Sequence, residues 1–80
     1  MTPYDIQITL KAANQIKSLP AKSLKQMIAL IEALSINPRP PGSKKILGMT
    51  GLYSESVEEF RLVYKVEEQE ILILFLAQAH

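Results

Sequence analysis

The amino-acid sequence predicts a single α+β domain with the element order β-α-α-β-β-β. Three observations predict it: an alternating segment near the N-terminus, two amphipathic segments in the first half, and strand-like segments in the second half. A chain of 80 residues has the size of one domain. No repeat, low-complexity tract or interdomain linker divides it, so residues 1–80 are expected to form one unit.

Polar and apolar residues alternate over residues 5–10, which is typical of a half-buried strand. A short amphipathic helix follows, and its apolar face comprises Ala12, Ala13, Ile16 and Leu19. Pro20 ends this helix, because the residue before a proline is pushed out of helical geometry. A proline is well tolerated at the start of a new helix, so a second helix is expected directly after it.

The second helix has the most regular pattern in the chain. Its apolar stripe comprises Leu24, Met27, Ile28, Ile31 and Leu34. The helix is expected to end near Ser35, because the prolines from Pro38 to Pro41 cannot continue it. Two helices joined by a short turn form an αα-hairpin, whose apolar face needs a sheet to cover.

The second half of the chain is expected to supply most of that sheet. Residues 46–47 are predicted as a short strand, and residues 52–57 and 60–66 as a hairpin with the loop Glu58-Glu59. This register pairs Tyr53 with Tyr64, Ser54 with Val63, Glu55 with Leu62, Ser56 with Arg61 and Val57 with Phe60. The continuously apolar residues 71–76 predict a central strand covered on both faces.

Composition and charge exclude several classes of protein. There is no cysteine, hence no disulfide framework or thiolate metal site. The N-terminus shows no signal peptide, and the longest apolar run is too short to cross a bilayer, so a cytoplasmic location is predicted. The net charge is +1, with a balance of +5 over residues 1–48 and −4 over residues 49–80.

That uneven charge has two interpretations. A basic half could bind an anion. Alternatively, the lysines of the helices are the solvated faces of those helices, namely Lys11, Lys17, Lys22 and Lys25. The sequence shows no Gly-rich phosphate loop, no metal-ligand spacing and no serine triad, and its few aromatic residues form no stacking platform. No cofactor or metal is predicted.

An ordered set of short segments resembles the RelE/ParE superfamily of bacterial toxin–antitoxin modules. The segments are Tyr4-Asp5-Ile6, Ile16–Pro20, Ile31–Pro40, Lys44–Gly48, Leu52-Tyr53 and Phe60–Tyr64. The resemblance implies a twisted, mainly antiparallel sheet with the helical hairpin packed on one face and a site on the open face. It also implies a toxin that a cognate antitoxin protein neutralises.

Many members of this superfamily are ribosome-associated ribonucleases that cut mRNA, whereas a ParE branch poisons DNA gyrase. Three functional hypotheses follow: a ribosome-dependent mRNA endoribonuclease of the RelE-like branch, a weak or inactive member that binds its antitoxin, and a gyrase inhibitor. The first is the favoured interpretation. It requires mRNA on the ribosome as a partner, and neither a membrane nor a small-molecule cofactor.

The resemblance implies metal-free RNA cleavage by lysine, arginine and tyrosine or histidine side chains. The predicted catalytic residues are Arg61, Lys45 and Tyr64. The predicted phosphate-binding residues are Lys44, Lys45 and Arg39, and His80 is a further candidate. Each has a simpler interpretation: Lys44 and Lys45 as an exposed pair, Arg61 as an ion-pair partner of Glu55 or Glu59, Tyr64 as a packing residue, and His80 as a mobile terminal residue.

The sequence departs from the superfamily at two places. Arginines are frequent in the superfamily at the positions of Ser54 and Ser56, beside Arg61. Glu55, Glu58 and Glu59 are expected to surround the same site and repel a phosphate, so a depleted basic site is predicted. Superfamily members also continue past the position of His80 with an arginine and often a tyrosine.

Overall fold

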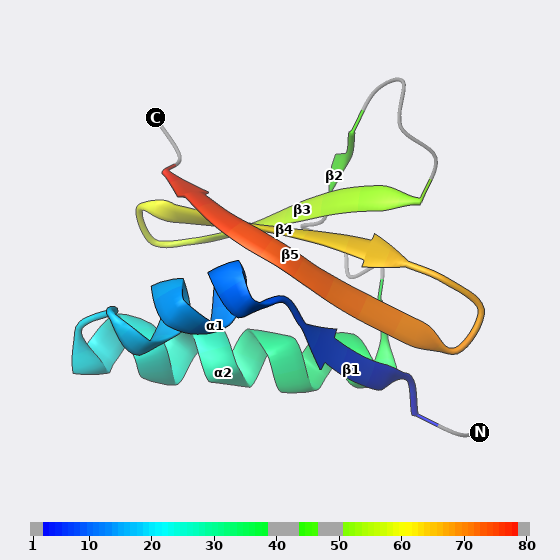
Figure 1. The fold of residues 1–80 in the computed structure, drawn as a ribbon, viewed down its shortest axis with the longest axis horizontal. Coiled ribbons are helices and arrows are strands. Elements are labelled where there is room, and N and C mark those ends of the chain that lie inside the picture. The colour runs from blue at the N-terminus through cyan, green and yellow to red at the C-terminus, as the bar shows by residue number, and fades with distance from the viewer. Residues whose placement is uncertain (1–2, 39–43, 47–50, 79–80) are drawn as a thin grey trace.

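The computed structural model describes residues 3–38, 44–46 and 51–78. The elements are β1 (Asp5–Ile8), α1 (Leu10–Lys17), α2 (Ala21–Ile36), β2 (Lys44–Lys45), β3 (Leu52–Val57), β4 (Phe60–Val66) and β5 (Glu70–Gln78). One sheet forms in the order β1-β5-β4-β3-β2, and both helices lie on one side of it (Figure 1). The α+β class and the mainly antiparallel sheet are confirmed, with β1 and β5 as the parallel pair.

The two helices form the predicted hairpin. Thr9 is the N-cap of α1, and its side chain accepts a hydrogen bond from the backbone N–H of Ala12. Because Thr9 caps the helix, the first strand ends at Ile8 and does not continue to Leu10, which begins α1. Pro20 lies at the N-cap of α2, and α2 ends at Ile36, one residue beyond the predicted end.

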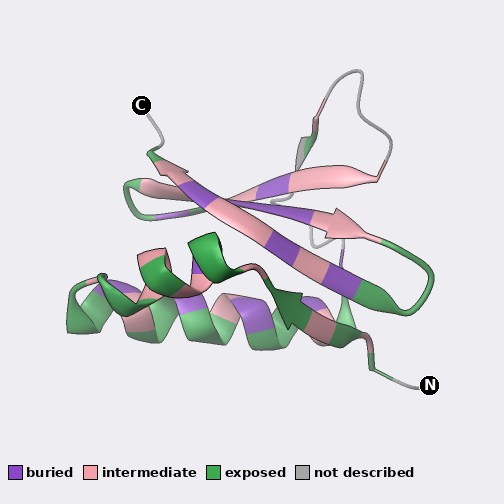
Figure 2. Cartoon of the chain, in the orientation of Figure 1, coloured by how far each residue is buried: buried purple, intermediate pink, exposed green. Residues whose placement is uncertain are grey.

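The buried stripe of α2 is rotated from the predicted one. Its buried residues are Ser23, Met27, Ile31 and Leu34. Ile28, which the sequence pattern placed in the core, is 46% exposed, because the face centred on Met27 and Ile31 turns toward the sheet. Figure 2 shows the outcome: buried positions recur at intervals along α2, separated by exposed ones.

The central position of β5 is confirmed, since it lies between β1 and β4. Its two faces differ, however. Ile71, Ile73 and Leu76 are buried against the helices, whereas Leu72, Leu74 and Phe75 are half-buried, so the predicted cover on both faces is complete on one face and partial on the other. Both helices cover the same side of the sheet.

The hairpin of β3 and β4 has the predicted register throughout, from Tyr53 opposite Tyr64 to Val57 opposite Phe60. Its two-residue turn places Glu58 at a φ of 54°, a left-handed conformation that favours glycine. The Glu58 carboxylate accepts a hydrogen bond of 3.1 Å from the Ser23 hydroxyl in the first turn of α2. That contact puts a negative charge near the N-terminus of a helix with no acidic residue in its first turn.

The short strand before the hairpin lies at Lys44–Lys45, and Ile46, where it was predicted to begin, is not part of it. Lys44 pairs with Ser54 and Lys45 with Tyr53. Ile46 follows the strand and donates its N–H to the carbonyl of Leu52 at 2.9 Å. Leu47 lies outside the described residues.

Candidate nucleic-acid interface

The candidate site lies on the face of the sheet away from the helices, which we call the open face. Side chains alternate between the two faces of a strand, and directly paired residues share a face. The register therefore gathers Ser54, Ser56, Arg61, Val63, Phe75 and Ala77 at the centre of the open face. The predicted grouping of Ser54, Ser56 and Arg61 on one face agrees with this register.

Arg61 is the basic residue of β4 at this centre, flanked by Ser56 on β3 and Ala77 on β5. Its side chain is half-buried. Within the described ranges an ion pair joins Lys65 and Glu67 at 3.6 Å, and Arg61 has no carboxylate partner. The alternative in which Arg61 pairs with Glu55 or Glu59 is thus absent here. A guanidinium without a carboxylate partner can bind a phosphate through two parallel hydrogen bonds.

The two serines beside Arg61 differ in exposure. Ser54 is buried and lies opposite Val63, whereas Ser56 is exposed and lies opposite Arg61. Neither supplies the charged, bidentate donor of an arginine. The open face therefore offers less positive charge around Arg61 than three arginines would give.

The predicted position of Glu55 beside the phosphate site was wrong. Glu55 pairs with Leu62, a core residue, and so lies on the face covered by the helices. One of its carboxylate oxygens is buried without a hydrogen-bond partner among the described residues, and this burial raises the pKa of Glu55 above its usual value. Because it lies on the other face, Glu55 adds no direct repulsion on the open face. Glu58 and Glu59 are exposed in the turn.

Tyr64 lies on the face opposite to Arg61. It is fully buried in the core, where its hydroxyl donates a hydrogen bond of 2.9 Å to the carbonyl of Pro38. Its ring also stacks on Tyr53, with 6.0 Å between the ring centroids. The structure therefore does not bring Tyr64 and Arg61 together, and its contacts are those of a packing residue.

The remaining predicted residues are dispersed. Lys45 is exposed on β2, but it pairs with Tyr53 and therefore lies on the helix side of the sheet, opposite to the open face. The backbone of Lys44 pairs with Ser54, and the structure does not describe its side chain. Arg39 and His80 lie outside the described residues. Of the predicted set, Arg61 is the residue whose described side chain lies on the open face.

Two residues that the sequence did not single out also reach this face. Phe75 lies opposite Val63, and the Lys11 ammonium lies over the Phe75 ring, 5.3 Å from its centroid. Lys11 was interpreted as a solvated helix lysine, and Phe75 as part of a strand covered on both sides. No sequence pattern predicts this contact, because the contact depends on an irregularity in the pairing of β4 and β5.

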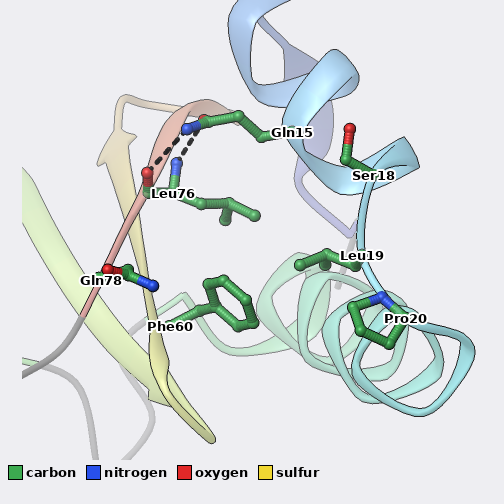
Figure 3. A pocket seen from close by; sticks show the side chains of 7 residues that line it. All are labelled: Gln15, Ser18, Leu19, Pro20, Phe60, Leu76 and Gln78. Atoms are coloured by element: carbon green, nitrogen blue, oxygen red, sulfur yellow. Dashed lines mark hydrogen bonds between the residues drawn. The ribbon is translucent and has the colours of Figure 1, made fainter.

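A hollow of about 290 Å³ lies at the opposite side of the sheet, beneath the ends of β4 and β5. Its lining residues are Gln15, Ser18, Leu19, Pro20, Phe60, Leu76 and Gln78. Figure 3 shows the Gln15 amide at its upper rim, joined to the backbone of Leu76 by two hydrogen bonds of 2.8 and 3.0 Å. The floor is apolar and carries no charged group, so this hollow does not extend the Arg61 site.

The described residues contain neither a metal-binding group nor a helix that could span a membrane. Among the described residues, no three His, Cys, Asp or Glu side chains gather in a way that could hold a metal ion. In the same ranges, every helix is too short or too polar to span a bilayer.

Comparison with known proteins shows similarity over nearly the whole chain. Residues 6–79 match the family model described as ParE toxin of type II toxin–antitoxin system, parDE. A curated protein of Methanocaldococcus jannaschii that carries the name toxin RelE1 is 28% identical over 74 residues, which are 89% of this chain and 82% of that protein.

Solved structures share the fold. A chain of the archaeal RelE–RelB complex from Pyrococcus horikoshii OT3 superposes with a TM-score of 0.86 at 25% identity, covering 98% of this chain and 96% of that chain. The isolated RelE toxin of E. coli superposes with a TM-score of 0.84 at 20% identity, covering 96% and 85%.

Proposed function

The chain belongs to the ParE toxin family, within the RelE/ParE superfamily of type II toxin–antitoxin toxins, and from the position of Arg61 and the similarity to toxin RelE1 we propose that it is a ribosome-dependent mRNA endoribonuclease that binds RNA through Arg61. Its RelE-like fold presents one side of the sheet without helices. We further propose that a cognate antitoxin protein binds and neutralises it in the cytoplasm, as the RelE–RelB complex of similar fold suggests.

One observation carries the proposal: Arg61 lies on the open face without a carboxylate partner among the described residues. Cleavage of RNA at a 2′-hydroxyl builds negative charge on the phosphate oxygens, and a guanidinium aimed at those oxygens stabilises that charge. Arg61 would hold the scissile phosphate in this way. Lys44, Lys45 and Arg39 would bind flanking phosphates, with Lys45 acting from the exposed edge of the sheet.

Tyr64 takes no part in the chemistry of this proposal, because its hydroxyl is committed to the Pro38 carbonyl inside the core. Ser54 and Ser56 replace two phosphate-binding donors, and the loss of one such donor typically costs about 3–4 kcal/mol of transition-state stabilisation. The proposed activity is therefore slow, and the ribosome has to contribute to the positioning of the mRNA and to the transfer of protons.

The test is a reconstituted translation reaction in which new mRNA ends are mapped by primer extension. The wild-type toxin is expected to produce cuts in the ribosomal A site. Arg61→Ala is expected to lower the rate by roughly a hundredfold or more, and Arg61→Lys by less, because a lysine keeps the charge but loses the bidentate geometry.

Lys25→Ala is the matched control, since it removes one positive charge from an exposed position of α2 and is expected to leave the rate unchanged. The proposal is wrong if the wild-type protein in excess over ribosomes produces no cuts. It is also wrong in its assignment of Arg61 if Arg61→Ala cuts as fast as the wild type.

A second candidate function is inhibition of DNA gyrase. The family model that matches the chain is that of parDE toxins, and the predicted nuclease residues Tyr64 and Lys45 are separated from Arg61. A gyrase inhibitor needs a protein-binding surface and no nuclease site. Accumulation of linear plasmid in a gyrase cleavage-complex assay, together with no mRNA cuts, would favour this function over the first.

A further inference from the structure

The bulge in β5 determines which side of the sheet Phe75 occupies. On β4, Val63 pairs with Phe75 but Tyr64 pairs with Ile73, so Leu74 is an extra residue without a partner on β4. Strict alternation would place Phe75 on the helix side with Ile71 and Ile73. The extra residue instead turns Phe75 to the open face and returns Leu76 to the core.

Thr9 holds this irregularity in place. Its hydroxyl donates a hydrogen bond of 2.6 Å to the carbonyl of Leu74, and its backbone N–H donates to the carbonyl of Ile73 at 3.0 Å. The same residue caps α1, so one side chain fixes both the bulge and the start of the helix. Bulges held by specific contacts often aim a side chain at a functional surface.

The start of α1 brings a positive charge to the re-aimed ring. Lys11 is exposed, two residues after the cap Thr9, and its ammonium lies 5.3 Å from the centroid of Phe75. This is a cation–π contact at an exposed site, and it is weak enough for the lysine to leave the neutral ring and bind a phosphate. Lys11 therefore extends the positive charge of the open face beyond β4.

Arg61 lies on the same face, diagonal to Phe75. Arg61 pairs with Ala77 and Val63 with Phe75, and diagonal neighbours of this kind are roughly 7–8 Å apart. A ring is thus flanked by two cations from different elements. No described residue at the centre of the open face is acidic, since its members are Ser54, Ser56, Arg61, Val63, Phe75 and Ala77.

We propose that Lys11, Phe75 and Arg61 together form a binding site for single-stranded RNA. A base stacks on Phe75, while Lys11 and Arg61 bind the phosphates on either side of it. A duplex cannot use the ring, because its bases are already stacked. This inference rests on the proposed function, to which it adds the residues that hold the RNA next to the Arg61 site.

The test measures binding of a short, unstructured, fluorescein-labelled RNA to the full chain by fluorescence anisotropy over a series of salt concentrations. Phe75→Leu is expected to weaken binding about 5- to 100-fold without changing the salt dependence, because it removes stacking and no charge. Phe75→Tyr is expected to bind like the wild type. If Phe75→Leu fails to fold, Lys11→Met decides the test.

Lys11→Met is expected to weaken binding and to reduce the slope of log K against log salt by about 0.7, the value for one phosphate contact on a single strand. Lys25→Met, a matched change on α2, is expected to leave that slope unchanged. The inference is overturned if Lys11→Met and Phe75→Leu, both folded, bind like the wild type, or if duplex DNA of equal length binds as tightly as the RNA.

These outcomes separate the inference from the proposed function. Loss of mRNA cleavage in Arg61→Ala, with normal RNA binding by the Lys11 and Phe75 variants, would leave the proposed function standing and remove the inference. Weakened RNA binding by those variants, with mRNA cleavage unaffected by Arg61→Ala, would support the inference and remove Arg61 from the proposed chemistry.

Discussion

On the helix-covered face of β3, a buried oxygen of the Glu55 carboxylate has no hydrogen-bond partner within the described part of the chain. An unsatisfied buried polar group lowers stability, and an ionised one does so more strongly. Burial raises the pKa of Glu55, so the folded protein holds this proton more tightly than the unfolded chain does. The stabilisation from this proton is complete below the unfolded pKa and is lost as pH rises through the folded pKa.

We therefore expect Glu55→Met to increase the free energy of unfolding by about 1 kcal/mol near neutral pH, because it replaces the carboxylate with an apolar side chain of similar length. The gain should shrink toward about pH 4, where the wild-type carboxyl is protonated. Urea denaturation at both pH values measures it. Glu59→Met, at an exposed turn position, is the control, and an equal gain at both pH values would contradict the argument.

The role of a single residue was the hardest property to predict from the sequence. The alternation of β3 already implied that Glu55 and Ser54 lie on opposite faces, yet Glu55 was grouped with the phosphate site because of its charge. Tyr64 was chosen for its chemistry, but its packing against Tyr53 and its bond to Pro38 depend on contacts between distant segments. Arg61 was placed correctly on its strand because the two-residue hairpin loop determines its register.

Among the elements, α1 and β5 have an unusual contact. β1 pairs with β5 only as far as Ile8 opposite Ile73, and the chain then turns into α1. Beyond that point, Gln15 of α1 bonds to both the N–H and the carbonyl of Leu76 (Figure 3). The side-chain amide thus makes the two hydrogen bonds that a neighbouring strand would make, and it covers an edge that could otherwise pair with another chain.

Gln15→Ala is expected to lower the free energy of unfolding by about 2–3 kcal/mol, because it leaves two partly buried backbone groups without partners. Hydrogen exchange of the Leu76 amide should also become faster. Chemical denaturation and exchange measured by NMR test the two effects. Asn14→Ala, an exposed neighbour on the same helix, is expected to change neither, and equal protection of Leu76 in Gln15→Ala would refute the role of the amide.

The elements differed in how far they could be predicted. The αα-hairpin and the β3–β4 hairpin followed from periodicity and turn residues, because those signals are local. The bulge at Leu74 could not be predicted, since residues 71–76 are apolar at every position and contain no change of pattern. The side-chain bond from Thr9 to Leu74 joins residues that are 65 positions apart, which no local pattern predicts.

The whole molecule is held together around β5. Ile73 is fully buried, pairs with Ile8 on one side and Tyr64 on the other, and packs against the helices. A domain of this length has a total stability of about 4–12 kcal/mol. Shortening the Ile73 side chain therefore removes a large part of this total, because its contacts join the helices to the sheet.

Ile73→Ala is expected to lower the free energy of unfolding by about 3–5 kcal/mol, through lost apolar burial and the cavity left behind. Ile36→Ala is the matched control, because the same atoms are removed from a side chain that is 74% exposed. It should change stability by less than about 0.5 kcal/mol. Urea denaturation of both proteins tests this, and similar losses in the two would contradict a core organised around β5.

The central place of β5 also affects how the chain folds as it is synthesised. β1 is made near the beginning, but its partner in the sheet is β5, more than 60 residues later. Until residues 70–78 have left the ribosomal exit tunnel, β1 has no strand to pair with, and β4 lacks one of its neighbours. The nascent chain can form its helical hairpin and its β3–β4 hairpin first, and the complete sheet forms only after residues 70–78 have emerged.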